Sequence, residues 1–156
     1  MTSASATVAI GPLGAGDRAR WELLARGYKA FYETELADAE YERAWHRLVA
    51  GDAVQALGAH VDGTLVGIAH FFFHPTVWLA DACHLQDLFV DPAARNRGVA
   101  RALIEAVAAA ARRRGAARVY WHTHTGNATA RALYDKVGRH IGMIRYDLAA
   151  ERAASA

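Results

Sequence analysis

The stretch from Leu88 to Ala100 constrains the fold of this chain more than any other. It reads LFVDPAARNRGVA: a short apolar run, then Asp-Pro, a basic turn with Gly98, and the start of a long helical pattern. A strand that passes through a glycine turn into a helix leaves several backbone N–H groups unpaired at the helix N-terminus, where the helix dipole also acts. Arg95 and Arg97 add full positive charges beside those groups. The segment therefore predicts a seat for a phosphate or pyrophosphate.

Strand and helix patterns surround this turn along the whole chain. Strands are predicted at 7–10, 53–61, 64–73, 82–90, 118–123 and 143–148, and helices at 17–36, 38–49, 98–114 and 127–137. Asp62-Gly63 between two apolar runs is a strong hairpin signal. A meander of strands followed by crossover helices implies an α/β (α+β) fold, with a mixed, mostly antiparallel sheet and helices on both faces. We expect a single domain over residues 1–156, with its core at about 7–148.

Composition, net charge and the number of cysteines limit the classes of protein to which this chain can belong. Hydrophobic residues make up 53% of the 156 residues and charged residues 22%, as in an ordinary globular domain. The sequence has no apolar run of about 18 residues and no signal-peptide pattern, so we expect a cytoplasmic protein without membrane contact. A net charge of +2 is too small to argue for nucleic-acid binding. The single cysteine, Cys83, excludes an internal disulfide, and we expect a buried, inert thiol there.

A second motif follows the last predicted crossover. The segment from Asn127 to Tyr134 reads NATARALY and matches N-x-x-A-x-x-L-Y, while the segment from Arg95 to Ala100 matches R/Q-x-x-G-x-G/A. Either motif alone is explained by a helix cap and core packing, but both occur here in order on the predicted elements. Together they resemble the GNAT superfamily of acyl-CoA-dependent N-acetyltransferases, and the resemblance covers about residues 8–148. It implies the GNAT fold, in which the central strands of the sheet splay apart.

The resemblance implies a role for each part of the two motifs. Acetyl-CoA would be the cosubstrate, with its pyrophosphate held by backbone amides between Asn96 and Arg101 and its pantetheine arm paired with the main chain of the preceding strand. The implied cofactor-binding residues are Leu88, Phe89, Val90, Arg95, Asn96, Arg97, Gly98, Val99, Ala100, Arg101 and Asn127. The hydroxyl of Tyr134 would donate a proton to the departing thiolate, a step that suits a phenol with a pKa of about 10. No metal is implied.

The acceptor amine must lose a proton before it attacks, because alkyl amines have a pKa of about 10.4. Relatives often carry a glutamate where this chain has Gln86, and an amide cannot accept that proton. By strand alternation, Gln86 shares a face with His84 and Leu88, while Asp87 points the other way. The sequence leaves the base open among Asp87, His84, His122, His124 and Glu33.

The acceptor site is predicted near the end of the first long helix. Aromatic and acidic side chains gather there, which suits a cationic amine, although a solvated acidic helix tip explains the pattern equally well. The segments 28–36, 86–90 and 120–124 are similar to the GNAT branch that acetylates histones and D-amino acids in yeast, and more distantly to polyamine acetyltransferases. This similarity favours a small primary amine, amino acid, polyamine or lysine-like side chain as acceptor, and a homodimer. The predicted acceptor-binding residues are Tyr28, Tyr32, Glu33, Gln86, Asp87 and His122.

Two other classes of function stay open at this point. A non-catalytic acyl-CoA-binding or sensing module would explain Gln86, since such a module needs no base. A nucleic-acid-binding domain would use the arginines between residues 95 and 118, but the charge excess is small and the glycine turn would go unused. His122 and His124 lie on one strand face, where two zinc ligands can stand, yet the spacing nominates no third ligand, so hydrogen-bonded or surface histidines are expected.

Overall fold

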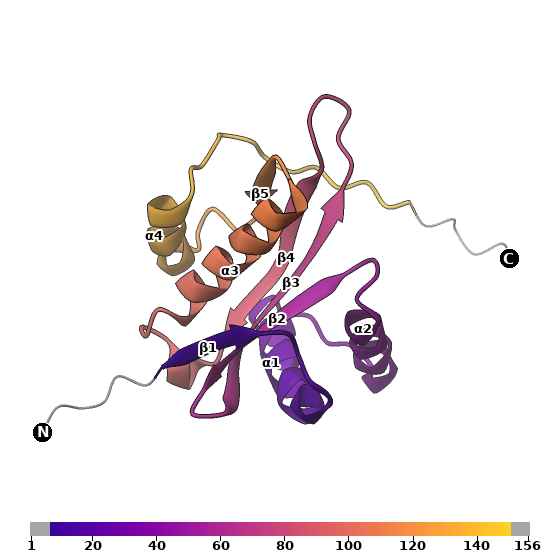
Figure 1. Cartoon of the computed structure of the whole chain (residues 1–156), viewed down its shortest axis with the longest axis vertical. Helices are drawn as coiled ribbons and strands as arrows, with labels where there is room; N and C mark the ends of the chain where they lie inside the picture. The colour runs from indigo at the N-terminus through magenta and orange to yellow at the C-terminus, as the bar shows by residue number, and fades with distance from the viewer. Residues whose placement is uncertain (1–6, 151–156) are drawn as a thin grey trace, which may run out of the picture. The chain divides into compact units, whose positions relative to one another are not determined.

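The computed structural model describes residues 7–150. By its internal contacts the chain divides into two compact units, residues 1–122 and 123–156, and each is described by itself. The larger unit contains one sheet whose strands follow the order of the chain (Figure 1): β1 (Val8–Gly11), β2 (Gln55–Val61), β3 (Thr64–His74), β4 (Ala82–Val90) and β5 (Arg118–Tyr120). The strands from β1 to β4 pair antiparallel, and β5 runs parallel to β4.

Helices cover both faces of this sheet. The first two helices of the unit pack on one face, and the helix that connects β4 to β5 packs on the other (Figure 1). A mixed, mostly antiparallel sheet between helices confirms the predicted fold class. The described residues contain no helix that is both long and apolar enough to cross a membrane. The helices of the larger unit are α1 (Arg18–Phe31), α2 (Asp38–Ala50) and α3 (Val99–Arg114), with short 3₁₀ turns at Ala15–Asp17 and Pro92–Ala94.

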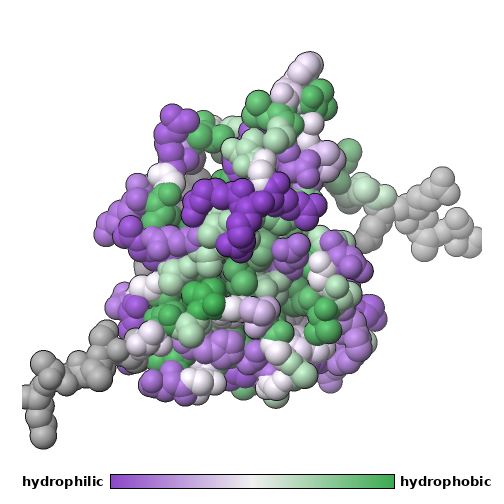
Figure 2. Space-filling view, in the orientation of Figure 1, coloured by the Kyte–Doolittle hydropathy of each residue, from purple (hydrophilic) through white to green (hydrophobic). Residues whose placement is uncertain are grey.

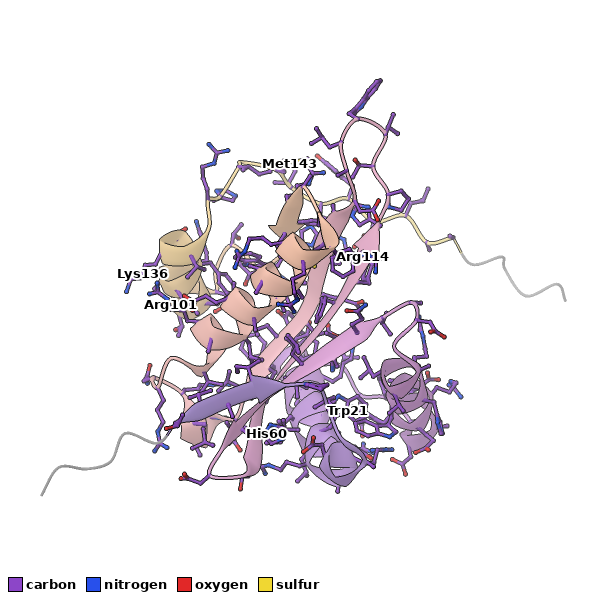
Figure 3. All side chains as sticks on the ribbon, viewed as in Figure 1. Trp21, His60, Arg101, Arg114, Lys136 and Met143 are labelled. Carbon is purple, nitrogen blue, oxygen red and sulfur yellow. The ribbon has the colours of Figure 1, made fainter. Side chains whose placement is uncertain are left out.

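Adjacent residues of β3 show how the two faces differ. Ile68 packs against Trp21, which is 1% exposed in α1 and is labelled in Figure 3. Gly67 faces the other way, and a Cβ on it would meet side-chain atoms of Val99 and Leu103 at 3.0 and 3.1 Å. The α1 face is therefore filled by large aromatic side chains, whereas the absence of a side chain at Gly67 lets α3 lie close to the sheet.

The helix α1 ends earlier than its apolar pattern predicts. The sequence predicted a helix to Leu36, but α1 ends at Phe31. Glu33 adopts a left-handed conformation with φ of 53°, and the N–H of Thr34 donates to the carbonyl of Lys29 at 2.9 Å, which closes the last turn. The acidic residues that follow therefore lie in an exposed loop and not on the last turn of a helix.

The loop between β3 and β4 is the most exposed apolar part of the larger unit. It forms the projection at the top of Figure 2, where hydrophobic side chains stand out from the body of the unit. Thr76 holds the loop in shape, since its hydroxyl donates to the carbonyl of Leu79 at 2.6 Å and accepts from the N–H of Leu79 at 3.1 Å. Trp78, at the tip, is 91% exposed.

The smaller unit contains α4 (Ala128–Val137) and an extended tail. The predicted last strand at 143–148 is wrong, because residues 139–150 form neither helix nor strand. Ile144, Tyr146 and Leu148 alternate with polar residues as in a strand, but the described hydrogen bonds join this segment to no neighbouring strand. The alternation of apolar and polar residues predicts which face of a sheet each side chain takes once a strand has formed. The strand itself forms only when its backbone pairs with the edge of another strand. These three side chains are 72–95% exposed.

Candidate functional site

A network of hydrogen bonds shapes the turn between β4 and α3. Asp91 accepts from the N–H of Ala93 at 2.9 Å and pairs with Arg20 of α1, and its own carbonyl accepts from the N–H of Ala94 at 2.8 Å. The backbone hydrogen bond from Ala93 and the ion pair with Arg20 hold the pKa of Asp91 below its usual range. The ionised carboxylate of Asp91 therefore holds the start of the turn in place, just before Arg95 and Arg97.

The backbone of this turn presents its N–H groups outward. Asn96 and Gly98 are both left-handed, with φ of 61° and 76°, and residues 95–98 are exposed. The N–H groups of Asn96, Arg97 and Gly98 donate to no acceptor in the described part of the chain, and no side chain caps α3. Successive N–H groups in such a turn, next to the positive end of a helix dipole, form an anion-binding concavity. The turn has the geometry that the sequence predicted for a phosphate seat.

The arginines of the turn take different positions. Arg95 folds back over β4, where its Nε donates to the carbonyl of Val90 at 3.2 Å and its guanidinium lies 5.7 Å from the ring centroid of Phe89. Arg101, in the first turn of α3 (Figure 3), pairs with Glu105 at 2.9 Å. Arg97 is exposed and makes no ion pair with the described residues. Of these three arginines, Arg97 is therefore the one whose guanidinium is most available to an anion.

The strands β4 and β5 stop pairing before β4 reaches this turn. The strands β4 and β5 pair only over Ala82–His84 and Arg118–Tyr120. Beyond His84, β4 continues to Val90 while β5 has ended, so one edge of β4 has no strand partner among the described residues. The backbone of Leu88 and Val90 lies in this part of β4. An extended ligand could pair there as a further strand, in the mode by which peptides add to sheet edges.

A bulge at Gln86 corrects the predicted orientation of its neighbour. In the register of β3 with β4, His70 is opposite Asp87 and Phe71 is opposite Leu85, so Gln86 is the extra residue. His70 and Phe72 share a face of β3, and Phe72 contacts His84. Asp87 therefore lies on the same face as His84, which is the α1 face. The prediction that Asp87 points the other way was wrong, because a bulge breaks the two-residue alternation.

Four side chains form a hydrogen-bonded chain on this face. The indole N–H of Trp21 donates to Nε2 of His70 at 3.0 Å, and Nδ1 of His70 lies 2.9 Å from a carboxylate oxygen of Asp87. Tyr28 hydrogen-bonds the same carboxylate, and its ring lies 5.0 Å from that of Tyr32. Asp87, Tyr28 and Tyr32 were predicted from the sequence as acceptor-binding residues, whereas Trp21 and His70 were not. A histidine within the otherwise apolar strand predicted at 64–73 was the available signal.

The carboxylate of Asp87 stays ionised in spite of its surroundings. Its side chain is 18% exposed, and burial alone would raise its pKa. The hydrogen bonds from His70 and Tyr28 and the charge of Lys29 outweigh this effect, and the pKa of Asp87 lies below its ordinary value. Burial, together with the negative charge of Asp87, raises the pKa of Tyr28. At neutral pH this part of the site holds one negative charge and one neutral phenol.

Histidines and a tyrosine cluster farther along the same face. Nε2 of His74 lies 2.8 Å from the hydroxyl of Tyr120, and the ring of His84 stacks on Tyr120 with centroids 4.6 Å apart. His122 meets His84 edge-on at 5.4 Å. The cluster makes this end of the α1 face aromatic and rich in proton-binding nitrogens. Within the described ranges, no three His, Cys, Asp or Glu side chains are grouped to hold a metal ion.

Several residues with predicted roles stand apart from these contacts. Glu33 is exposed in the loop after α1 and makes no ion pair with described residues. Gln86 is also exposed, at the bulge. Cys83 is fully buried, as predicted, and burial raises the pKa of its thiol to about 11. A thiol of this kind is a poor nucleophile at neutral pH.

The second motif lies in the smaller unit. Asn127 caps α4, since its side-chain oxygen accepts from the N–H of Ala130 at 3.2 Å. Arg131 secures the preceding loop by donating to the carbonyl of Thr125 at 2.8 Å. Tyr134 lies on α4 and is partly buried. The local structure predicted for this motif, a capped helix after a short strand, is confirmed.

Comparison with known proteins defines the class. Residues 19–138 match the acetyltransferase (GNAT) family, which is more than half of the chain. The matched range includes the glycine turn, the open edge of β4 and the capped α4. The chain therefore belongs to the GNAT family of acetyltransferases and is an N-acetyltransferase.

Named relatives support this assignment. The chain is 31% identical over 135 residues to the D-amino-acid N-acetyltransferase HPA3 of Saccharomyces cerevisiae, covering 83% of each protein. It is 32% identical over 89 residues to thialysine N-epsilon-acetyltransferase of Caenorhabditis elegans, covering 57% of this chain and 56% of the relative. In fold it is similar to the aminoglycoside N-acetyltransferase AAC(6')-Iy in complex with CoA, with a TM-score of 0.81 and 20% identity over 98% of this chain and all of that one.

Proposed function

We propose that this protein transfers an acetyl group from acetyl-CoA directly to the primary amine of a small molecule, amino acid, polyamine or lysine-like side chain, in a complex that holds both substrates. The observation that carries the proposal is the turn before α3, with its left-handed Asn96 and Gly98 and its outward N–H groups. The pyrophosphate of acetyl-CoA binds these groups, from Asn96 to Arg101, with Arg95 and Arg97 beside it. Relatives that are acetyltransferases of amines support the reaction type.

The pantetheine arm extends from this seat along the open edge of β4. It pairs with the main chain of Leu88 and Val90, and a backbone N–H near the bulge polarises the thioester carbonyl. The amine nitrogen attacks the carbonyl carbon, the C–N bond forms and the C–S bond breaks. The amine loses one proton to solvent before the attack, and Tyr134 donates its proton to the departing thiolate. The second proton, which the nitrogen releases as the amide forms, restores the neutral phenol of Tyr134. Asn127 contacts the arm.

The acceptor binds on the α1 face of the sheet. Tyr28, Tyr32, Asp87 and His122 lie on this face, and the exposed Gln86 stands at the bulge. Holding the amine beside the bound thioester supplies much of the acceleration in a direct transfer, because it removes the entropic cost of bringing the reactants together. We also propose a homodimer, which the molar mass in solution tests.

The test is a panel of amines assayed for release of free thiol from acetyl-CoA. We expect aliphatic primary amines to stimulate release and mass spectrometry to find the acetylated amine. Calorimetry with acetyl-CoA in the absence of amine is the companion measurement. No uptake of acetyl-CoA would refute the proposal. Uptake without transfer to any amine would favour a non-catalytic acyl-CoA-binding or sensing module, the reading that the amide of Gln86 supports.

A further inference from the structure

Two hydrogen-bonded side chains that can carry protons, Tyr120 and His74, lie on the α1 face of the sheet where β5 ends. Nδ1 of His74 lies 2.9 Å from the carbonyl oxygen of Pro75, and Nε2 lies 2.8 Å from the hydroxyl oxygen of Tyr120. A carbonyl oxygen can only accept, so the proton of the neutral imidazole ring is on Nδ1. The unprotonated Nε2 therefore accepts from the hydroxyl of Tyr120.

Charged and titratable neighbours surround the ring of Tyr120. The imidazole of His84 stacks on it, with centroids 4.6 Å apart, and His122 meets it edge-on at 5.9 Å. The guanidinium of Arg118 lies 6.0 Å from the centroid of the same ring. A positive charge nearby favours the negative charge that develops on the phenol oxygen when the hydroxyl gives its proton to His74. These neighbours therefore suit a hydroxyl that passes protons on.

Tyr120 lies where the open edge of β4 begins. It is the last residue of β5, and it is opposite His84 in the register of the two strands. From this pair the open edge runs past the bulge at Gln86 to Val90. The pantetheine arm is proposed to enter along this edge, with its thioester near the bulge. Tyr120 is therefore beside the reacting end of the arm, on the face where the acceptor is proposed to bind.

The acceptor amine needs a group that takes up a proton. An alkyl amine has a pKa of about 10.4, so it arrives as an ammonium ion and must lose a proton before its nitrogen can attack. The amide of Gln86 takes no proton. The pKa of Asp87 lies below its ordinary value, which makes its carboxylate a weak base. Imidazole, with an ordinary pKa of about 6.5, is a better proton acceptor at neutral pH than either group.

We propose that Tyr120 and His74 carry this proton from the acceptor ammonium to solvent. The N–H bond of the ammonium breaks and its proton binds the Tyr120 oxygen, while the Tyr120 hydroxyl proton passes to Nε2 of His74. The resulting imidazolium, whose bond to Pro75 is at the surface, then releases one proton to water. Tyr120 contacts the amine and is the catalytic residue, and His74 acts through it as a positioning residue that receives the proton. The inference rests on the proposed acetyl transfer, for which it assigns the path of the first proton.

The test compares ethylamine with 2,2,2-trifluoroethylamine as acceptors at pH 7, assayed by thiol release from acetyl-CoA. The two amines are similar in size, but fluorine withdraws electron density, so trifluoroethylamine is uncharged at this pH and needs no relay. Tyr120→Phe removes the hydroxyl, and His74→Gln keeps an acceptor for that hydroxyl but takes no proton. Both variants should lower kcat/KM for ethylamine about 100-fold or more and keep the wild-type value for trifluoroethylamine. Equal losses with both amines, or none with either, would overturn the proposal.

The pH dependence and two matched controls separate a relay from a structural role. At pH 10 a large share of the ethylamine is already uncharged, so the deficit of both variants should shrink there. A deficit of the same size at pH 7 and pH 10 would overturn the proposal. Tyr41→Phe and His46→Gln make the same chemical changes on α2, where Tyr41 packs against Arg26 and His46 is exposed. We expect wild-type rates in both, and a matching deficit in these controls would overturn the assignment to Tyr120 and His74.

The ring nitrogens of His74 supply a measurement that needs no turnover. At pH 9 the ¹⁵N shifts of the wild-type ring should show a protonated Nδ1 and an unprotonated Nε2. A protonated Nε2 would overturn the relay even if neither variant folds. The outcomes also separate the relay from the proposed function. Transfer to ethylamine that Tyr120→Phe leaves intact would refute the relay alone, whereas a wild type that acetylates no amine would refute the proposed function and the relay with it.

Discussion

Replacement of Gly98 by leucine tests the phosphate seat directly. Gly98 has φ of 76°, and a Cβ at this position would meet no atom within 4 Å. The left-handed conformation costs an L-residue roughly 1–2 kcal/mol, so the free energy of unfolding should fall by that amount without any steric clash. For a chain of this length, the melting temperature should fall by about 2–8 °C. The variant is therefore expected to fold.

The effect on acetyl-CoA should be much larger than this loss of stability implies. A leucine side chain at Gly98 occupies the open space over the N–H groups of the turn, where the pyrophosphate is proposed to bind. Each hydrogen bond to a charged group contributes about 1.5–3 kcal/mol, so loss of even one weakens binding about tenfold or more. Isothermal titration calorimetry with acetyl-CoA, at a temperature where the variant is folded, measures this change.

Gly63 supplies a matched control for the same substitution. It lies in the β2–β3 turn with φ of 78°, and a Cβ there would also meet no atom within 4 Å. Gly63→Leu should therefore lose the same stability, roughly 1–2 kcal/mol, and keep wild-type affinity for acetyl-CoA. If Gly98→Leu binds acetyl-CoA as tightly as the wild type, or if both variants lose affinity alike, the phosphate seat is not at this turn.

Three further outcomes follow from the site. Tyr134→Phe should lower kcat by about 10²–10⁴-fold while the affinity for acetyl-CoA is kept, and undiminished turnover would remove Tyr134 from the acid role. Because the pKa of Asp87 is lower in the folded protein than in the unfolded chain, its ionisation stabilises the fold above about pH 4 and this contribution is lost as the pH falls further. The difference in unfolding free energy between wild type and Asp87→Asn, from urea titrations, should therefore shrink on acidification; a constant difference would contradict this. Cys83, fully buried and with its pKa raised to about 11, should react with a thiol reagent at pH 8 only after denaturant is added.

Local signals predicted most of the fold because they act over short distances along the chain. Asp62-Gly63 and the glycine turn at Gly98 require left-handed conformations, which the structure contains at all three positions. One failure depends on partners that are distant in sequence. The segment 143–148 has the alternation of a strand, but pairing with another strand decides whether it becomes one. The end of α1 depends instead on the left-handed conformation of Glu33. Glutamate is not a residue type that favours this conformation, so the sequence did not predict it.

The bulge at Gln86 shows why the acceptor side was harder to predict than the cofactor side. A phosphate seat consists of backbone N–H groups, and a glycine in the sequence indicates the turn that presents them. The orientation of a side chain on β4, by contrast, depends on the register of β4 with β3. One extra residue places Asp87 beside His70 and leaves Gln86 exposed. An acidic group is thus present on the α1 face although the residue at the bulge itself carries an amide. The amide of Gln86 therefore supplies no proton acceptor at the bulge, while the ionised carboxylate of Asp87 keeps a negative charge on the α1 face of the sheet.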